Sequence, residues 1–358
     1  MDILQFEERK RDHLRHALDS ANQADGAGSL DRIRLVHEAL PDLDLEEVSL
    51  SSQCLGSSSE TPFFIAAMTA GHADAPRLNR QLALACSRRG WAMGVGSQRR
   101  ELESFELTLG SDGGDRWSKL RAEAPALRLY ANIGLSQLPR ARLENLQRLV
   151  GEMDATALVV HANALQEGLQ REGTPQFGGS IDALARLCEG MKIPVILKET
   201  GCGFSEGSVR RVACLGLAAI DVSGLGGTHW GRIEGARAGE VDALGRRLTR
   251  AAQVFKDWGI STVQSVLNAR KVLGSGPVET WASGGVRSGL DAAKLMALGA
   301  FQVGFAKPAL EAAQLGDEGL DEWMEQIEFE TRLAMFCSGM KSTAQLRGRE
   351  TVWTKHAP

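Results

Sequence analysis

Short runs of apolar residues recur along the chain, spaced by roughly 25 to 35 residues up to about residue 225, and two more runs follow. Several are hydrophobic at nearly every position, which is typical of parallel strands buried on both faces. Most precede a helical repeat of apolar positions, such as residues 181–189 and 290–298. The runs cover residues 62–67, 91–95, 127–132, 157–161, 194–198, 218–223, 278–283 and 301–305. Eight such units predict an α/β fold with a closed (β/α)8 TIM barrel.

Two stretches depart from this repeat. Residues 1–60 precede the first strand as an N-terminal extension and begin with a charged arm that we expect to be helical. Residues 224–277, between strands six and seven, begin with the Gly-rich GLGGTHWGRIEGARAG, and helical patterning resumes near Arg246. An insertion after a barrel strand falls on the catalytic face, so we expect a lid there rather than a loop without a role. Residues 1–358 are expected to form one domain.

The charge pattern excludes several classes of protein. The 41 basic and 45 acidic residues are interspersed, and the net charge of −4 gives no footprint of a nucleic-acid binder. The N-terminus has no apolar signal region, and the longest apolar stretch, residues 62–68, is too short for a membrane helix. Six scattered cysteines form no CxxC pair, so reduced thiols are expected. The chain is therefore predicted to be cytoplasmic, with no nucleic-acid or membrane partner.

Polar or glycine-rich motifs follow seven of the eight strands. In order they are AAMTAG, GVGSQRR, ANIG, HANALQE, LKETGCG, DVSGLGGT and ASGGVRSG. The carboxyl ends of barrel strands carry the catalytic residues of this fold. Each motif alone is also compatible with an ordinary turn, because Gly, Asn and Ser suit turn backbones. Their repetition predicts a site at this end of the barrel.

The motif ASGGVRSG, at residues 282–289, predicts a phosphate site. Adjacent glycines expose backbone N–H groups, and the following helix presents its positive end. The loops after strands seven and eight hold phosphate in many barrels. A tight turn accounts for the glycines but not for Arg287.

Strand five places a lysine at the mouth of the barrel. Strand alternation turns Ile196 and Lys198 to the same face. A lysine buried there could form a Schiff base or stabilise negative charge on a reduced flavin. The structural alternative is a salt bridge to Glu199 or to another acid at a strand end.

The run HANALQE combines neutral donors with one carboxylate. His161 and Asn163 share a strand face, and Gln166 and Glu167 follow at the start of a loop or helix. Such a set suits an oxygen-rich substrate and Mg²⁺, which takes one carboxylate together with substrate phosphates and waters. The alternatives are a core histidine and a helix-capping glutamate.

Positive charge for a diphosphate comes from two other segments. Arg9 and Lys10 lie in the arm, and residues 97–100 (SQRR) follow strand two. Arginine suits bidentate contacts with phosphate oxygens. For the arm, a solvated helix face is the alternative.

The order of RKxDH, AAMTxG, GSQRR, ANIG, HxNxxQE, KETGxG, DVSGxGGTxW, ASGGVRSG and GMKSTAQLR resembles the type 2 isopentenyl-diphosphate isomerase family, from residue 9 to about residue 347. HxNxxQE and DVSGxGGTxW are its specific parts. The resemblance implies isomerisation of isopentenyl diphosphate to dimethylallyl diphosphate with reduced FMN and Mg²⁺. It also implies NADPH as reductant, a small-molecule diphosphate substrate and a homo-oligomer, either tetramer or octamer.

The resemblance also implies roles for individual residues. FMN would contact Ala67, Met68, Thr69, Ser97, Asn132, Lys198, Ser223, Thr228, Gly285, Arg287 and Ala306. Substrate would meet Arg9, Lys10, Ser97, Arg99, His161, Asn163 and Gln166, and Glu167 would bind Mg²⁺. Gln166 and His161 are the expected catalytic residues, with Gln166 near the allylic carbon.

Two positions depart from the family pattern. Ala70 stands where the pattern has the first of two glycines, and His229 stands where it has serine. Two other functions compete with the isomerase. An FMN-dependent 2-hydroxy-acid oxidase or dehydrogenase needs a general-base histidine in SNHGxR after a late strand, and DVSGLGG and ASGGVRS lack it. A flavin-binding homologue without catalytic activity is the third.

Overall fold

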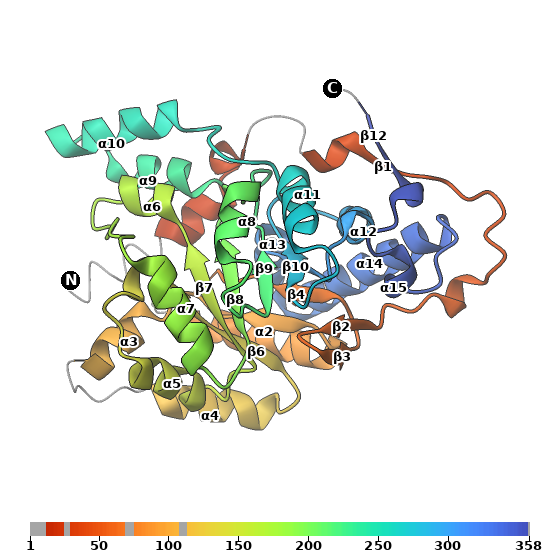
Figure 1. Cartoon of the computed structure of the whole chain (residues 1–358), viewed down its shortest axis with the longest axis horizontal. Helices are drawn as coiled ribbons and strands as arrows, with labels where there is room; N and C mark the ends of the chain where they lie inside the picture. Colours follow the sequence, from red (N-terminus) through yellow and green to blue (C-terminus); the bar gives the residue numbers. More distant parts are fainter. Residues whose placement is uncertain (1–11, 25–28, 69–74, 107–112, 357–358) are drawn as a thin grey trace.

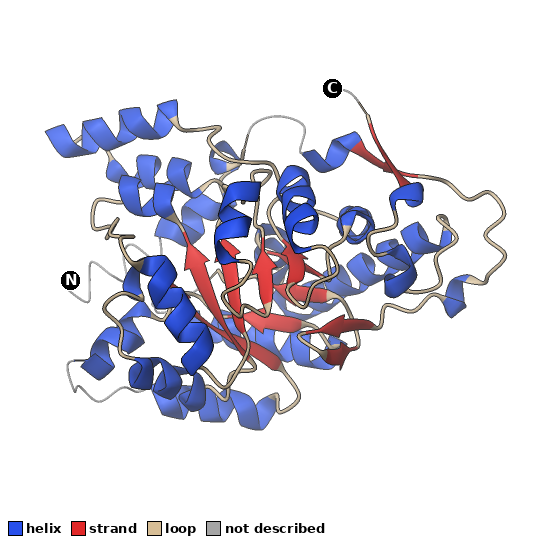
Figure 2. Cartoon of the chain, viewed as in Figure 1, coloured by secondary structure: helices blue, strands red, loops and turns tan. Residues whose placement is uncertain are grey.

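The structure is a computed structural model that describes residues 12–24, 29–68, 75–106 and 113–356. Eight parallel strands close into a barrel, and helices surround it (Figures 1 and 2). The strands are β4 (Phe63–Ile65), β5 (Ala92–Gly94), β6 (Arg128–Gly134), β7 (Ala157–Ala162), β8 (Val195–Glu199), β9 (Ala219–Asp221), β10 (Glu279–Ala282) and β11 (Gln302–Phe305). They follow one another around the barrel in chain order, and β11 pairs with β4. The prediction of a (β/α)8 barrel is confirmed.

Strand alternation divides each strand between two environments. In β8, Val195 and Leu197 belong to the hydrophobic layer beneath the outer helices, whereas Ile196 belongs to a separate cluster with Tyr130 and Trp281. That second cluster fills the barrel interior, as alternation requires. Nearer the carboxyl ends, the inward positions become polar, so the barrel has an apolar base and a polar mouth.

The helices that follow the strands cover the barrel from outside. They are α2 (Ala75–Arg89), α3 (Arg99–Glu106), α4 (Gly113–Glu123), α5 (Leu143–Glu152), α6 (Ala164–Leu169), α7 (Ser180–Gly190), α8 (Glu206–Val212), α11 (Thr262–Leu273), α12 (Gly289–Leu298), α13 (Lys307–Gln314), α14 (Gly316–Phe336) and α15 (Thr343–Leu346). α7 and α12 confirm the helical repeats expected at residues 181–189 and 290–298. Within the described residues, no helix is both long enough and apolar enough to cross a membrane.

A β-hairpin of the N-terminal extension covers the base of the barrel. Strands β2 (Ser52–Cys54) and β3 (Ser57–Ser59) form a hairpin, and Cys54 joins the apolar cluster of the interior. Strand β1 (Ile33–Leu35) pairs with β12 (Trp353–Lys355), so this part of the extension lies beside the C-terminal strand (Figure 1). The charged arm is helical at residues 12–18, within the segment where a helix was expected.

The insertion after β9 contains two helices of its own. Helix α9 (Trp230–Ala238) packs on α6, and α10 (Ala243–Val254) packs on α9 (Figure 1). The expectation that helical structure resumes only near Arg246 is therefore wrong, because α9 begins inside the Gly-rich stretch. His229 makes this early start possible, since its Nδ1 accepts the N–H of Arg232 at 3.2 Å and caps the helix.

Candidate functional site

A pocket of about 500 Å³ opens at the carboxyl ends of the barrel strands. Every site residue expected from the sequence lines it, where the structure describes that residue. They are Ala67, Met68, Ser97, Arg99, Asn132, His161, Asn163, Gln166, Glu167, Lys198, Ser223, Thr228, Gly285, Arg287 and Ala306. Arg9, Lys10, Thr69 and Ala70 lie outside the described residues. The volume suits a small-molecule ligand.

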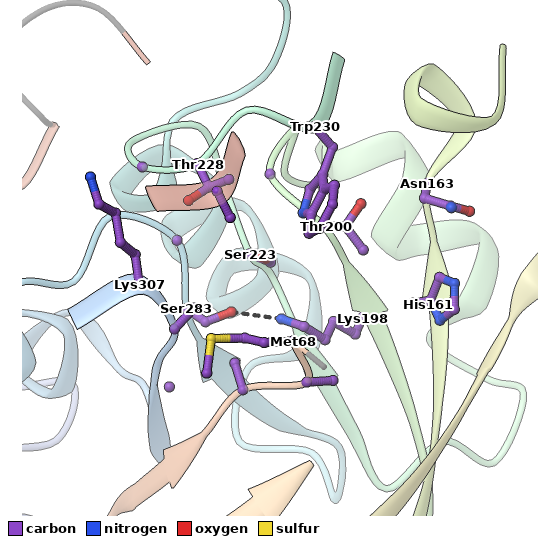
Figure 3. Close-up of a pocket in the computed structure, with 18 of the residues that line it drawn as sticks. Met68, His161, Asn163, Lys198, Thr200, Ser223, Thr228, Trp230, Ser283 and Lys307 are labelled. Atoms are coloured by element: carbon purple, nitrogen blue, oxygen red, sulfur yellow. Dashed lines mark hydrogen bonds between the residues drawn. The ribbon is translucent and has the colours of Figure 1, made fainter. Parts of the chain in front are cut away.

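Lys198 stands at the centre of the pocket floor (Figure 3). Its Nζ donates to Ser283 Oγ at 2.7 Å and to the carboxylate of Asp221, which lies behind it. The ion pair expected as the structural alternative therefore exists, but its acid is Asp221 and not Glu199. The lysine is 8% exposed. The lysine nevertheless lines the pocket, and Figure 3 shows Met68 close by.

Glu199 instead organises the turn after β8. One of its carboxylate oxygens accepts the backbone N–H groups of residues 200–203. Burial raises the pKa of Glu199 to about 7, although these N–H groups act in the opposite direction. The turn puts Thr200 and Gly201 on the pocket wall, with Thr200 near Trp230 in Figure 3.

Two glycine pairs form a close backbone contact on one wall. Gly284 and Gly285 have φ of 97° and 75°, and a Cβ on Gly285 would overlap the backbone of Gly226. A Cβ on Gly227 would lie 2.8 Å from the N atom of Gly285. The glycines therefore allow the loops after β9 and β10 to touch. Arg287 lines the same side and is paired with Asp31 at 2.6 Å.

The opposite wall carries His161 and Asn132. Asn132 Nδ2 donates to the carbonyl of Val95 at 3.0 Å, which leaves its Oδ1 as an acceptor. His161 Nδ1 lies 2.9 Å from that oxygen, so Nδ1 carries a proton and donates. His161 is thus a fixed polar group in the pocket wall, where Figure 3 shows it beside Asn163.

Asn163 links the other polar residues of HANALQE. Its Nδ2 donates to Gln166 Oε1 and to Glu167 Oε1, both at 3.2 Å. Glu167 Oε2 also accepts the N–H of Thr174 at 2.6 Å. Asn163 is 4% exposed, yet its Oδ1 has no hydrogen-bond partner among the described residues. A buried acceptor without a partner is costly, so the site is suited to a ligand that donates to it.

The sequence analysis missed two residues of the candidate site: His13, which lines the pocket, and Glu234, which contacts Gln166 from behind it. Glu234 lies in α9 and accepts from Gln166 Nε2 at 3.0 Å, and His13 Nε2 lies 2.9 Å from the same oxygen. Burial favours the neutral acid, but the charges of His13 and Arg237 outweigh it and lower the pKa of Glu234 to about 2. His13 also meets Trp230 edge to face, at 5.2 Å between ring centroids.

This cluster joins the N-terminal arm to helices α9 and α6. A signal for His13 was present, because it is the last residue of the motif RKxDH. Glu234 had none, since an acidic residue in a Gly-rich stretch is ordinary on a solvated surface. Within the described residues, no group of three or more His, Cys, Asp or Glu side chains could hold a metal ion. A divalent cation here would need ligand oxygens from substrate and water.

Comparisons with known proteins agree with this geometry. The FMN-dependent dehydrogenase family matches residues 10–177 and 131–354. An isopentenyl-diphosphate delta-isomerase of Bdellovibrio bacteriovorus is 47% identical over 97% of this chain and 98% of that protein. The isopentenyl-diphosphate delta-isomerase of Legionella pneumophila strain Corby is 48% identical over 96% of this chain and 97% of that protein.

Solved structures support the fold alone. A mandelate oxidase aligns with a TM-score of 0.64 at 17% identity, covering 99% of both chains. A flavocytochrome b2 aligns with a TM-score of 0.68 at 16% identity, covering 99% of this chain and 86% of that chain. The sequence relatives decide the function class, because their identity is high over nearly the whole chain. The chain therefore belongs to the isopentenyl-diphosphate delta-isomerases, an isomerase family within the FMN-dependent dehydrogenases.

Proposed function

We propose that the chain converts isopentenyl diphosphate to dimethylallyl diphosphate, with reduced FMN on the floor of the pocket and Mg²⁺ beside Glu167. The observation that carries the proposal is the position of Gln166. Its amide is held by Asn163 on one side and Glu234 on the other, within the pocket that contains Lys198. An amide fixed in this way stays uncharged. It can therefore hold in position the substrate carbon that gains or loses a proton.

The floor and the glycine wall fit FMN. Lys198 supplies a donor to an electron-rich ring edge, and the chemistry that FMN supplies when bound is proton exchange with the substrate carbon skeleton. The backbones of Gly226 and Gly285 touch, and both glycines line the pocket. Arg287 and Lys307, the first residue of α13, line it as well. A phosphate group suits this wall, since N–H groups and cations converge there.

The opposite wall fits a diphosphate with its cation. The Oδ1 atom of Asn163 lacks a partner and suits a cation rather than the phosphate oxygens, and the adjacent carboxylate of Glu167 suits the same cation. Arg99 adds a guanidinium, whose Nη1 lies 3.3 Å from Thr174 Oγ1. One carboxylate with substrate oxygens and waters is a usual arrangement for Mg²⁺. Arg9 and Lys10 of the arm are proposed to complete the positive charge.

The lid excludes water from the reacting carbons in this proposal. Trp230 begins α9 and lines the pocket, and His13 packs against its ring edge. Loss of water strengthens each charge interaction inside the site. NADPH as reductant, cytoplasmic location and a tetrameric or octameric assembly stay predictions.

An assay of allylic diphosphate formation tests this function. Enzyme loaded with FMN and Mg²⁺ is reduced with dithionite and supplied with isopentenyl diphosphate, and oxidised enzyme is the control. We expect product with the reduced enzyme alone. Turnover of a 2-hydroxy acid by oxidised enzyme, without allylic product, would contradict the proposal and favour the oxidase class.

A further inference from the structure

Lys198, Asp221 and Ser283 form one buried network behind the pocket floor. The register of β8 and β9 sets Lys198 beside Asp221, and Ser283 follows the end of β10. Ser283 Oγ lies 2.8 Å from Asp221 Oδ1 and 2.7 Å from Lys198 Nζ. The hydroxyl therefore bridges the two charged groups, and each of the three side chains restrains the other two.

The two charges differ in their access to the pocket. Lys198 and Ser283 line it, whereas Asp221 does not. Asp221 is 1% exposed, so its carboxylate is shielded from solvent and from ligand. Its Oδ1 also accepts the N–H of Ser223 at 3.3 Å, at a residue whose φ of 33° is unusual for a side-chain-bearing residue. Asp221 thus holds both a cation and a strained turn that face the ligand.

We propose that Asp221 is a positioning residue that limits how far Lys198 favours the reduced cofactor over the oxidised one. This inference rests on the proposed function, because it requires FMN on the pocket floor. A cation beside the ring favours the more negative, reduced form, and a carboxylate behind that cation opposes it. The pair acts as a dipole whose positive end faces the ligand, so its field is weaker than that of a lysine alone.

The measurement is the reduction potential of bound FMN, which reports the ratio of the dissociation constants for oxidised and reduced cofactor. Asp221→Asn keeps the size of the side chain and removes its charge. We expect the preference for reduced over oxidised FMN to increase about tenfold. The reduction potential should then rise by about 30 mV for a two-electron couple. Ser283→Ala is the matched control, because it removes a hydrogen bond without removing a charge, and it should move the ratio less.

The double variant Lys198→Met/Asp221→Asn replaces the pair without leaving a lone buried charge. It should move the ratio about tenfold towards oxidised FMN, because it removes the positive end that faces the ring. It also provides the test if Asp221→Asn fails to fold. A ratio within twofold of wild type, in either variant that folds and binds FMN, would overturn the inference. Wild-type protein that binds no FMN would instead overturn the proposed function, and the inference with it.

Discussion

At the scale of single residues, Gln166 and Glu167 are adjacent but make different contacts. Gln166 donates to Glu234 in the lid, whereas Glu167 accepts from Thr174 in its own loop. If Glu167 binds Mg²⁺, Glu167→Gln should raise both the metal requirement and KM, and excess Mg²⁺ should partly restore activity. Gln166→Ala should lower kcat with metal dependence unchanged, and a hundredfold loss corresponds to about 2.7 kcal/mol.

Steady-state kinetics of both variants across a Mg²⁺ series separate these roles. Each variant serves as the control for the other, since the two changes lie at neighbouring positions on α6. Loss of metal affinity alone in both variants would assign Gln166 to the metal site. Wild-type behaviour in both would remove HANALQE from the catalytic machinery.

His229 is a second residue whose protonation state can be tested. It is 1% exposed, its Nδ1 accepts from Arg232, and its Nε2 lies 3.2 Å from the carbonyl oxygen of Trp258. These contacts require the neutral ring, and burial lowers the pKa of His229 below the ordinary value of 6.5. Because the pKa is lower in the folded state, the histidine of the unfolded chain takes up a proton at a higher pH than that of the folded chain. The stability from this contact is therefore complete above pH 6.5 and is lost as the pH falls towards the folded-state pKa.

We expect His229→Ala to lower the free energy of unfolding by about 1 to 3 kcal/mol, from the lost cap and the cavity. His229→Ser should recover part of this loss, because serine is a good N-cap. Denaturant unfolding at several pH values gives both results. The difference between wild type and His229→Ser should shrink below pH 6.5. A difference that is constant with pH would show that His229 is not held neutral.

At the scale of elements, the two helices of the proposed lid, α9 and α10, cross closely. Gly235 of α9 faces Ala252 of α10, and a Cβ on Gly235 would overlap the Cβ of Ala252. Glu234, the residue before Gly235, makes the contacts to His13 and Gln166. A shift of α9 would therefore displace Glu234 and, through it, Gln166 on α6.

Gly235→Ala should destabilise the lid by about 1 to 3 kcal/mol through overpacking, although alanine favours helix by up to about 1 kcal/mol. The matched variant Gly235→Ala/Ala252→Gly removes the overlap and should regain most of the loss. Hydrogen exchange of α9 and α10 would report the change, together with KM. If the single and double variants exchange alike, the crossing does not control the lid.

Strands and regular helices were predictable, whereas the lid contacts were not. The strand runs are apolar at nearly every position because the barrel buries both faces, so sequence alone located all eight. Alternation also placed Lys198 correctly on the inner face. Its partner Asp221 lies on another strand, and the pairing depends on register between segments 23 residues apart. The arm and α9 likewise meet through His13 and Glu234, a long-range contact without any local pattern.

At the scale of the whole molecule, segments far apart in the chain pair although they carry little local signal. β1 and β12 are three residues each and bring residues 33–35 beside residues 353–355. Neither was predicted, because such short strands lack a periodic pattern. Because the net charge is −4, the proposed anionic substrate depends on local cations and N–H groups. The electrostatics of the pocket, rather than of the molecule, should therefore control substrate binding.

The most direct test of the proposed reaction follows a proton. Moving the double bond requires a proton to be added at the terminal carbon and another to be removed next to the diphosphate-bearing carbon. Reduced, FMN-loaded enzyme with Mg²⁺ is therefore incubated with isopentenyl diphosphate in D₂O, and product is analysed by NMR. We expect dimethylallyl diphosphate that carries deuterium, with far slower formation by Gln166→Ala and none by oxidised enzyme. Absence of allylic product from reduced, folded, FMN-loaded wild type would contradict the account.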